Sequence, residues 1–362
     1  MLHQLKNCQG LFVVIGFFFV LSLIAPLYCM AQSKDSGVEI KAGVTEELFP
    51  IIAKQLADGN EQFNLKPAVM WKLRNQSDEP KKITLVAEIP QWTPQCINTI
   101  TLNPRENTFA TVTQNPFGPN LLKVKTLFPA TLSVKAIMNG EIVFQGTKNI
   151  KIRAAGDMLW SMQAPFDTAY MIAAWVTPND PLVEQILGLA RKKWNLRSKS
   201  LSGYAGPDVK DQIRAIFDAV RSVGIGYVDS HVAFGHVGFA QRVRLPRESV
   251  QQRAANCIDG AVLFASLFEN IGLDPLIVLV PNHAFVGVKI AQNSNQAIFI
   301  ETTMVGRSKF DSFKTGEFTY DAAVKEGTNK YINAFNASGS DKEALRMIDI
   351  KKARAMGIHP LW

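Results

Sequence analysis

The chain contains Ala-Ala-Asn-Cys-Ile-Asp-Gly at 254–260, then an apolar run up to Gly272, then two strand-like runs at 275–288 and 297–303. Asn256 is a preferred residue at the start of a helix, and Gly272 is a typical stop. Between them, apolar side chains recur every three or four residues. These are Ile258, Ala261, Ala265, Phe268 and Ile271. The pattern predicts a helix with one buried face that begins at Cys257.

Three side chains in this stretch suit nucleophilic catalysis. Cys257 lies in the first turn of the predicted helix, where unpaired N–H groups and the helix dipole favour the thiolate. We therefore expect a lowered pKa for this thiol. His283 opens one strand-like run and Glu301 closes the next, so pairing of these strands would bring the carboxylate to the imidazole. Nucleophile, base and orienting acid then form a Cys-His-acid triad.

The run Asn-Cys-Ile-Asp-Gly to His-Ala-Phe-Val-Gly-Val (256–288), followed by Phe-Ile-Glu-Thr-Thr (299–303), resembles the core of the transglutaminase-like superfamily. Members of that superfamily share the papain-like cysteine-protease fold. On their pattern Cys257 matches the nucleophile, His283 the base and Glu301 the orienting acid. The resemblance covers roughly residues 208–303 and implies acyl transfer through a thioester on the cysteine.

The sequence departs from that pattern at three positions. Ala255 stands where the family usually has Gly, Phe285 where it has Trp, and Glu301 where Asp is commoner. Each triad residue also has an ordinary structural explanation, because buried cysteines, core histidines and charges at strand ends are frequent. Their order and flanking residues together favour the triad.

Gln241 is a fourth candidate. Papain-like sites use a side-chain donor beside the thiolate, together with the backbone N–H of the cysteine, to bind the oxyanion. Gln241 precedes the predicted helix at a suitable distance, and a solvent-exposed loop glutamine is the alternative. His231 and His236 have no accompanying cysteine or carboxylate cluster. We therefore expect no metal ion and no organic cofactor.

Residues 1–31 have the pattern of a secretory signal peptide. Lys6 precedes an apolar run from Leu11 to Leu27, and Cys29-Met-Ala31 resembles a cleavage site with small residues. An uncleaved anchor is the competing explanation, but seventeen residues are few for a membrane span. A lipoprotein anchored at Cys29 fits less well, because Pro-Leu-Tyr precedes that cysteine. We expect cleavage, a periplasmic or secreted location, and no later membrane span.

The remaining chain is long enough for two domains. Apolar and polar residues alternate from about 38 to 155, and Asn139-Gly140 is a strong hairpin signal. This region predicts an immunoglobulin-like β-sandwich, with a brief helix within 46–56. Residues 160–362 form the predicted transglutaminase-like domain of papain-like fold, with further helices starting at Asp180-Pro181 and Asp208. The expected fold class is α+β.

Composition restricts the partners of the protein. The net charge is +8, but lysines and arginines are dispersed without aromatic interleaving, which argues against nucleic acid. Only Cys96 and Cys257 remain after the leader, too few for a disulfide scaffold, so we expect Cys96 to be buried and unpaired. A protein or peptide of the cell envelope is the expected substrate. Three functions stay open: hydrolysis of peptide or isopeptide amides, protein cross-linking by amine transfer, and non-catalytic binding.

Overall fold

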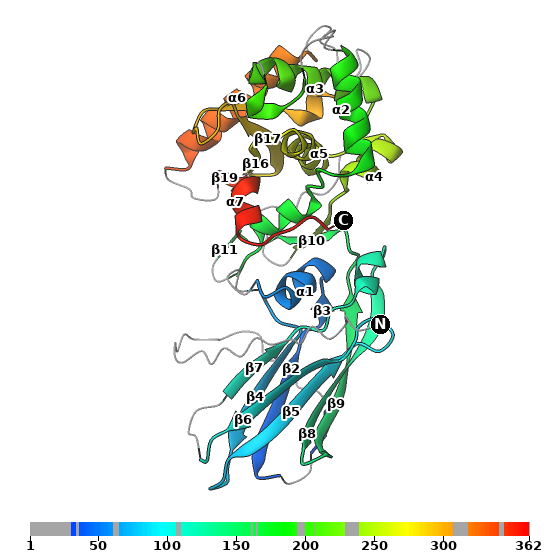
Figure 1. Ribbon diagram of the computed structural model, residues 1–362, viewed down its shortest axis with the longest axis vertical. Coiled ribbons are helices and arrows are strands. Elements are labelled where there is room, and N and C mark those ends of the chain that lie inside the picture. Colours follow the sequence, from blue (N-terminus) through cyan, green and yellow to red (C-terminus); the bar gives the residue numbers. More distant parts are fainter. Residues whose placement is uncertain are drawn as a thin grey trace. The chain divides into compact units, whose positions relative to one another are not determined.

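The computed structural model describes residues 30–33, 36–60, 65–105, 110–160, 162–163, 166–193, 200–206, 208–228, 239–306, 318–339 and 344–361. The protein is a mixture of helices and several sheets, as expected for the α+β class (Figure 1). It divides into two compact units, Met1–Ala155 and Gly156–Trp362. Within the described residues, every helix is too short or too polar to cross a lipid bilayer.

Most of the predicted signal peptide lies outside the described residues. Its last two residues, Met30 and Ala31, belong to the first strand, β1 (Met30–Ser33), which pairs with Phe144–Thr147 of β9. The expected cleavage point after Ala31 therefore falls within β1. His231 and His236 also lie outside the described residues.

The N-terminal unit contains a three-stranded sheet, β2-β4-β7, and a six-stranded sheet in which β1-β9-β8-β5-β6 are neighbours and β3 pairs with β9. All pairings are antiparallel except β3 with β9. The strands are β2 (Val38–Val44), β3 (Glu47–Leu48), β4 (Val69–Asn75), β5 (Lys81–Glu88), β6 (Cys96–Leu102), β7 (Ala110–Gln114), β8 (Phe128–Met138) and β9 (Glu141–Ile152). Asn139-Gly140 joins β8 to β9, so the predicted hairpin is confirmed.

Alternating side chains of the two sheets fill one hydrophobic core. In β4, Val69, Trp71 and Leu73 are fully buried, which agrees with the period-two pattern of the sequence. The buried side chain of Gln114 in β7 accepts a hydrogen bond from Trp71 Nε1 at 2.7 Å and donates to Leu85 O and Cys96 O in the other sheet. This glutamine therefore ties the sheets together with its hydrogen-bonding groups satisfied.

Helical segments of the N-terminal unit are short. The helix expected within 46–56 occurs as α1 (Pro50–Ala57), and a single-turn segment, η2 (Pro119–Lys123), follows β7. Cys96 is buried in β6, and neither of the two cysteines in the described part of the chain forms a disulfide. The prediction that Cys96 is buried is thus confirmed.

The C-terminal unit has one four-stranded antiparallel sheet, ordered β18-β17-β16-β19, with helices packed on it. Its strands are β16 (Pro275–Val280), β17 (His283–Lys289), β18 (Ala297–Ile300) and β19 (Arg346–Asp349). Its helices are α2 (Pro181–Lys193), α3 (Val209–Val223), α4 (Pro246–Gln252), α5 (Cys257–Asn270), α6 (Tyr320–Ala337) and α7 (Ile350–Ala355). The predicted starts at Asp180-Pro181 and Asp208 are confirmed, and Asp208 accepts a hydrogen bond from Lys210 N.

Small elements complete this unit. Paired short strands are β10 (Asp157–Trp160) with β14 (Phe239–Arg242), β11 (Met162–Gln163) with β12 (Phe166–Asp167), and β13 (Gly226–Tyr227) with β15 (Ala254–Ala255). Single-turn or 3₁₀ segments are η3 (Ala169–Trp175), η4 (Gly203–Ala205) and η5 (Thr302–Met304). Of these, β14 contains Gln241, β15 ends just before Asn256 and Cys257, and η5 follows Glu301.

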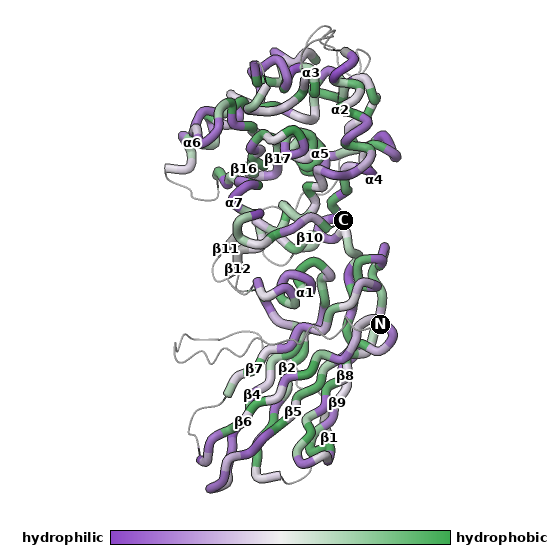
Figure 2. The backbone as a smooth tube through the Cα atoms, viewed as in Figure 1, coloured by the Kyte–Doolittle hydropathy of each residue, from purple (hydrophilic) through white to green (hydrophobic). Residues whose placement is uncertain are grey.

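The helix α5 begins at Cys257 as predicted, but the expected single buried face is wrong. Every residue from Cys257 to Phe268 is buried. The reason is that α5 packs against β16, β17, α2, α4 and η5 at once, so it has no solvent side. Figure 2 shows α5 as one of the most uniformly apolar segments of this unit. Such a helix is central to its domain.

We expect residues 156–362 to fold without the N-terminal unit, because α5 and its sheet form a core within this segment. A fragment of these residues should unfold in one cooperative thermal transition and retain a near-ultraviolet circular dichroism signal. A fragment that keeps its secondary structure but lacks that signal would be molten. In that case the two units depend on each other for folding.

Candidate active site

The start of α5 is fixed by reciprocal hydrogen bonds. Asn256 Oδ1 accepts from the N–H of Asp259 at 2.9 Å, and Asp259 Oδ2 accepts from the N–H of Asn256 at 3.1 Å. This capping box satisfies donors that the first turn of a helix leaves unpaired. It holds Cys257, the first helical residue, in one orientation.

An ion pair anchors the same turn. The side chain of Asp259 is fully buried. Its Oδ2 accepts a hydrogen bond from Arg244 Nη1 at 2.8 Å, and its Oδ1 accepts one from the backbone N–H of Arg244, also at 2.8 Å. Burial raises the pKa of Asp259, and the hydrogen bonds from Arg244 and Asn256 oppose that rise. Because the partner of a buried carboxylate is costly to remove, Arg244 fixes the segment before α4 to the start of α5.

The Cys257 thiol is buried, with 1% of the residue exposed. Its sulfur accepts hydrogen bonds from the backbone N–H groups of Ala284 and Ile258. Both hydrogen bonds favour the thiolate and so lower the pKa. Burial outweighs these hydrogen bonds, because a thiolate removed from water loses its hydration. The net effect raises the pKa of Cys257 from 9.0 to about 11. The lowered pKa predicted from the helix dipole is therefore wrong for this state. At neutral pH Cys257 is therefore a protonated thiol.

His283 and Glu301 lie together as the sequence predicts. The strand β17 begins with His283, and β18, its neighbour in the sheet, ends one residue before Glu301. His283 Nε2 and Glu301 Oε2 are 2.7 Å apart, a short charge-assisted distance. Only 2% of Glu301 is exposed, so this carboxylate is held in an interior environment.

Glu301 is an ionised acceptor at neutral pH. Burial acts to raise its pKa, but the hydrogen bond and charge of His283 and the two donors of Thr303 together lower it. Oε1 accepts from Thr303 N at 3.0 Å and from Thr303 Oγ1 at 2.7 Å, which leaves Oε2 for the imidazole. Because a carboxylate cannot donate, Nε2 of His283 carries the proton. Nδ1 is then the ring nitrogen that is able to accept a proton.

Cys257 and His283 meet through the backbone of the residue after the histidine. Ala284 N–H points at the sulfur, so the start of α5 and the start of β17 are in contact. Between the described atoms of Cys257 and His283 themselves there is no hydrogen bond. Such catalytic hydrogen bonds are often long without substrate and shorten in its complex. The structure thus brings together a buried thiol, an imidazole with a fixed tautomer, and a carboxylate that accepts from it.

Gln241 is buried in β14, opposite Met158 of β10, so the alternative of a solvent-exposed glutamine is wrong. It lies three residues before Arg244, whose contacts with Asp259 reach the first turn of α5. Its role as an oxyanion donor stays a prediction. The donors that do lie at the sulfur are the backbone N–H groups of Ala284 and Ile258.

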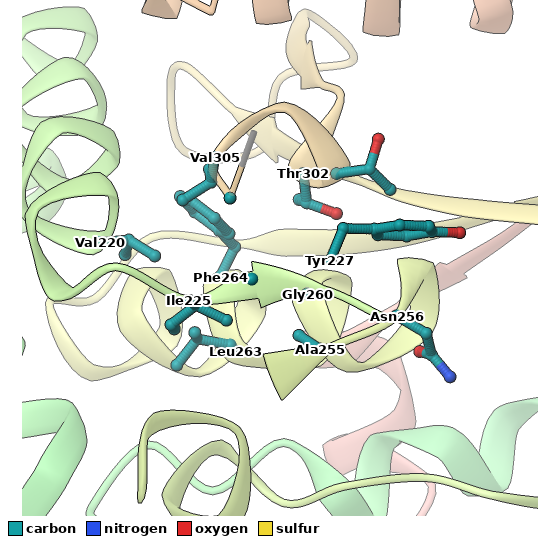
Figure 3. A pocket seen from close by; sticks show the side chains of 13 residues that line it. Val220, Ile225, Tyr227, Ala255, Asn256, Gly260, Leu263, Phe264, Thr302 and Val305 are labelled. Carbon is teal, nitrogen blue, oxygen red and sulfur yellow. The ribbon is translucent and has the colours of Figure 1, made fainter. Parts of the chain in front are cut away.

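A small pocket lies beside the triad, between the start of α5 and η5 (Figure 3). Asn256, Thr302 and Thr303 line it, and these residues adjoin Cys257 or Glu301 in sequence. Its volume is about 20 Å³, enough for one water molecule. The remaining walls are mainly apolar, from Val220, Ile225, Leu263, Phe264 and Val305. The triad side chains are not among its walls, so this pocket does not identify a substrate.

Close packing at one glycine sets the distance between α5 and the segment that carries the acid. A Cβ at Gly260 would lie 2.8 Å from Thr302 Oγ1 and 3.1 Å from Thr302 Cβ. Only a residue without a side chain lets η5 approach α5 this closely. Gly260 therefore helps to place Glu301 near the helix that carries Cys257.

Sequence reasoning missed three residues of this site: Arg244, Asp259 and Thr303. Asp259 had a local signal, because Asn-x-x-Asp at a helix start is the spacing of a capping box. Thr303 follows Glu301 by two residues, a usual spacing for a local side-chain hydrogen bond. Arg244 had no such signal, since it is fifteen positions from Asp259 and its role depends on the tertiary fold.

No protein-family model matches this chain, and a search of curated proteins finds no match either.

The buried thiol predicts slow alkylation. At pH 7.5, Cys257 of the native protein should react with iodoacetamide at least about 100-fold more slowly than in the guanidinium-unfolded chain. This factor follows from the thiolate fraction at a pKa of about 11 against 9.0. Mass mapping of the labelled peptides measures each cysteine, with buried Cys96 as an internal comparison. Rapid labelling of Cys257 alone at neutral pH would contradict a protonated resting thiol.

Proposed function

We propose that this protein is an exported cysteine-dependent acyl-transfer enzyme that hydrolyses peptide or isopeptide amide bonds. Cys257 is the nucleophile, His283 the base and Glu301 the orienting acid. The observation that carries the proposal is the 2.7 Å contact between His283 Nε2 and Glu301 Oε2, made by a buried, ionised carboxylate. This pairing fixes the imidazole tautomer that a cysteine nucleophile requires.

The reaction begins from the protonated thiol. As sulfur attacks the amide carbonyl carbon, its proton passes to His283 Nδ1, and the carbonyl π electrons move to oxygen. Backbone N–H groups at the sulfur, with Gln241 as the proposed side-chain donor, stabilise the oxyanion. The intermediate then collapses, the C–N bond breaks, and His283 returns the proton to the leaving amine. A thioester remains on Cys257.

Release of the thioester follows the same path in reverse. Water loses a proton to His283 Nδ1 and attacks the acyl carbon, the C–S bond breaks, and sulfur regains the proton. The products are a carboxylic acid and the free thiol. If a primary amine replaces water, the product is a new amide, which is the cross-linking reaction of a transglutaminase. Water is the abundant acceptor, and hydrolysis is therefore the proposed outcome.

The fold assignment belongs to the same proposal. We assign residues 160–362 to the transglutaminase-like superfamily with its papain-like fold, and residues 38–155 to an immunoglobulin-like β-sandwich. Support comes from the order Cys257, His283, Glu301 on a helix start and two adjacent antiparallel strands. The two sheets around one core support the sandwich. The leader pattern supports export to the periplasm or beyond, where a protein or peptide is the substrate.

Substitutions in the triad test the chemistry. Cys257→Ala and His283→Ala should each lower turnover by roughly 10⁴-fold or more, because triad members act as a unit. Glu301→Gln should lower turnover by about 10⁴-fold. Its amide group either places an N–H donor against the Nε2–H of His283 or favours the other imidazole tautomer. Glu301→Asp keeps the charge and should retain more activity than Glu301→Gln. The assay measures amine release from a mixed library of peptide and isopeptide amides.

Two controls accompany these variants. Near-ultraviolet circular dichroism establishes that each variant is folded, and acid quenching followed by mass mapping detects the thioester on Cys257. Added primary amine separates the two acceptors, because a transglutaminase would form the new amide at the expense of the acid. Equal activity of Glu301→Gln and the unsubstituted protein would exclude Glu301 as the orienting acid.

A second function is favoured by the burial of the nucleophile. Cys257 is only 1% exposed, and the pKa of its thiol is raised to about 11. Such a cysteine suits a non-catalytic module that binds a cell-envelope protein or peptide. In that case Cys257→Ala should leave partner binding unchanged, and no thioester should form with any substrate. Co-purification of the unsubstituted protein and of Cys257→Ala from envelope fractions, compared by mass spectrometry, distinguishes the two functions.

A further inference from the structure

The helix α6 lies against the strand that leads to the orienting acid. A Cβ at Gly327 would be 2.7 Å from Phe299 O and 2.8 Å from Ile300 N, so the helix touches the β18 backbone directly. One turn earlier, Ala323 O accepts the N–H of Glu301 at 3.0 Å. The close approach at Gly327 and the hydrogen bond at Ala323 thus fix α6 relative to Glu301.

The beginning of α6 is anchored independently. Arg214 of α3 donates to both carboxylate oxygens of Asp321, and its guanidinium lies 4.6 Å from the ring centroid of Tyr320. The Tyr320 ring also packs edge-on against Phe217 of α3. These contacts hold the helix at its first turn, so its later residues have a defined position over the sheet.

This position brings Lys330 to the triad acid. Lys330 follows Gly327 by three residues, close to one helical turn, and its Nζ lies 3.6 Å from Glu301 Oε2. The same oxygen accepts a hydrogen bond from His283 Nε2 at 2.7 Å. Lys330 Nζ is equally 3.6 Å from Glu326 Oε1 on the surface of α6. One carboxylate oxygen therefore faces an imidazole on one side and an ammonium on the other.

We propose that Lys330 is a positioning residue for the reaction, whose ammonium keeps Glu301 Oε2 ionised and directed at His283. This inference rests on the proposed function of the triad. Among the residues that the structure describes, the charged or titratable groups that face Glu301 are His283 of β17, Lys330 of α6 with its neighbour Glu326, and Cys257 of α5. In this set Lys330 supplies an ammonium group, while in the proposed reaction His283 takes up and releases a proton.

A positive charge at this place counters a specific difficulty. Burial disfavours the ionised form of Glu301, and a neutral acid cannot hold the Nε2–H of the histidine as an acceptor. The side chain of Glu301 is 3% exposed, whereas that of Lys330 is 35% exposed. The ammonium therefore loses less of its hydration than the carboxylate that it stabilises.

A purely structural explanation is that Lys330 forms an ordinary surface pair with Glu326 four residues earlier on the helix. That pair would stabilise α6 slightly and would not affect Glu301. The two explanations differ in what removal of the charge does to the buried carboxylate. Lys325 on the same helix provides a matched control, because it is an exposed lysine.

The test is a carboxyl titration of the full-length protein labelled with ¹³C at the glutamate side chains. Glu301→Gln assigns the Glu301 signal by its disappearance. In Lys330→Met, the Glu301 carboxyl should titrate about 0.5 to 1 pH unit higher, less than for a fully buried pair because Lys330 is partly exposed. Lys330→Arg should restore the original titration, and Lys325→Met and Glu326→Gln should leave it within about 0.2 pH unit.

Turnover provides the second measurement. Lys330→Met should lower kcat several-fold at unchanged KM, with the loss greatest on the acid side of the pH profile, and Lys330→Arg should recover it. An unchanged Glu301 titration in Lys330→Met overturns the inference, whatever the turnover. A shifted titration in a protein that shows no turnover and forms no thioester supports the role of the charge and contradicts the proposed enzyme.

Discussion

The complete burial of α5 is the constraint on which the candidate site depends. A helix without a solvent face must satisfy its first N–H groups internally. Asn256 accepts from the N–H of Asp259, and Asp259 accepts from the N–H of Asn256, while Arg244 donates to the Asp259 carboxylate and holds it in place. The same burial removes water from the Cys257 sulfur and raises its pKa to about 11. It also requires η5 to pack against Gly260, which places Glu301 beside the helix start. The position of the thiol and its raised pKa therefore have one origin.

Two buried groups of opposite behaviour give this core its pH dependence. The folded-state pKa of Cys257 lies above 9.0, so the unfolded chain loses this proton first, and stability falls as pH rises from 9.0 towards about 11. Glu301 has a lowered pKa, so its contribution is present above its ordinary 4.5 and is lost as pH falls through the folded value. Between these limits the site contains a neutral thiol and a charged acid.

Local signals predicted the elements of the site well, and long-range signals were absent. Asn256, a good N-cap, and the strand-like runs around His283 and Glu301 indicated a helix start and two strands, which the structure contains. One-sided burial of α5 failed as a prediction because the pattern cannot reveal how many elements surround a helix. The lowered pKa of Cys257 failed for the same reason: the dipole is visible in sequence, but the loss of solvent is not.

Lys330 illustrates the limit of such reasoning. It is twenty-nine residues after Glu301, on a helix whose docking depends on Gly327 and on a backbone hydrogen bond to Ala323. Nothing in its neighbours distinguishes it from Lys325. Its relation to Glu301 also bears on the resting thiol. A charged Glu301 raises the pKa of Cys257 further, so an ammonium beside that carboxylate offsets part of its effect on the sulfur while keeping it as an acceptor for His283. In the proposed reaction, the acid can then orient the base without adding its full charge to the penalty on negative charge at the Cys257 sulfur.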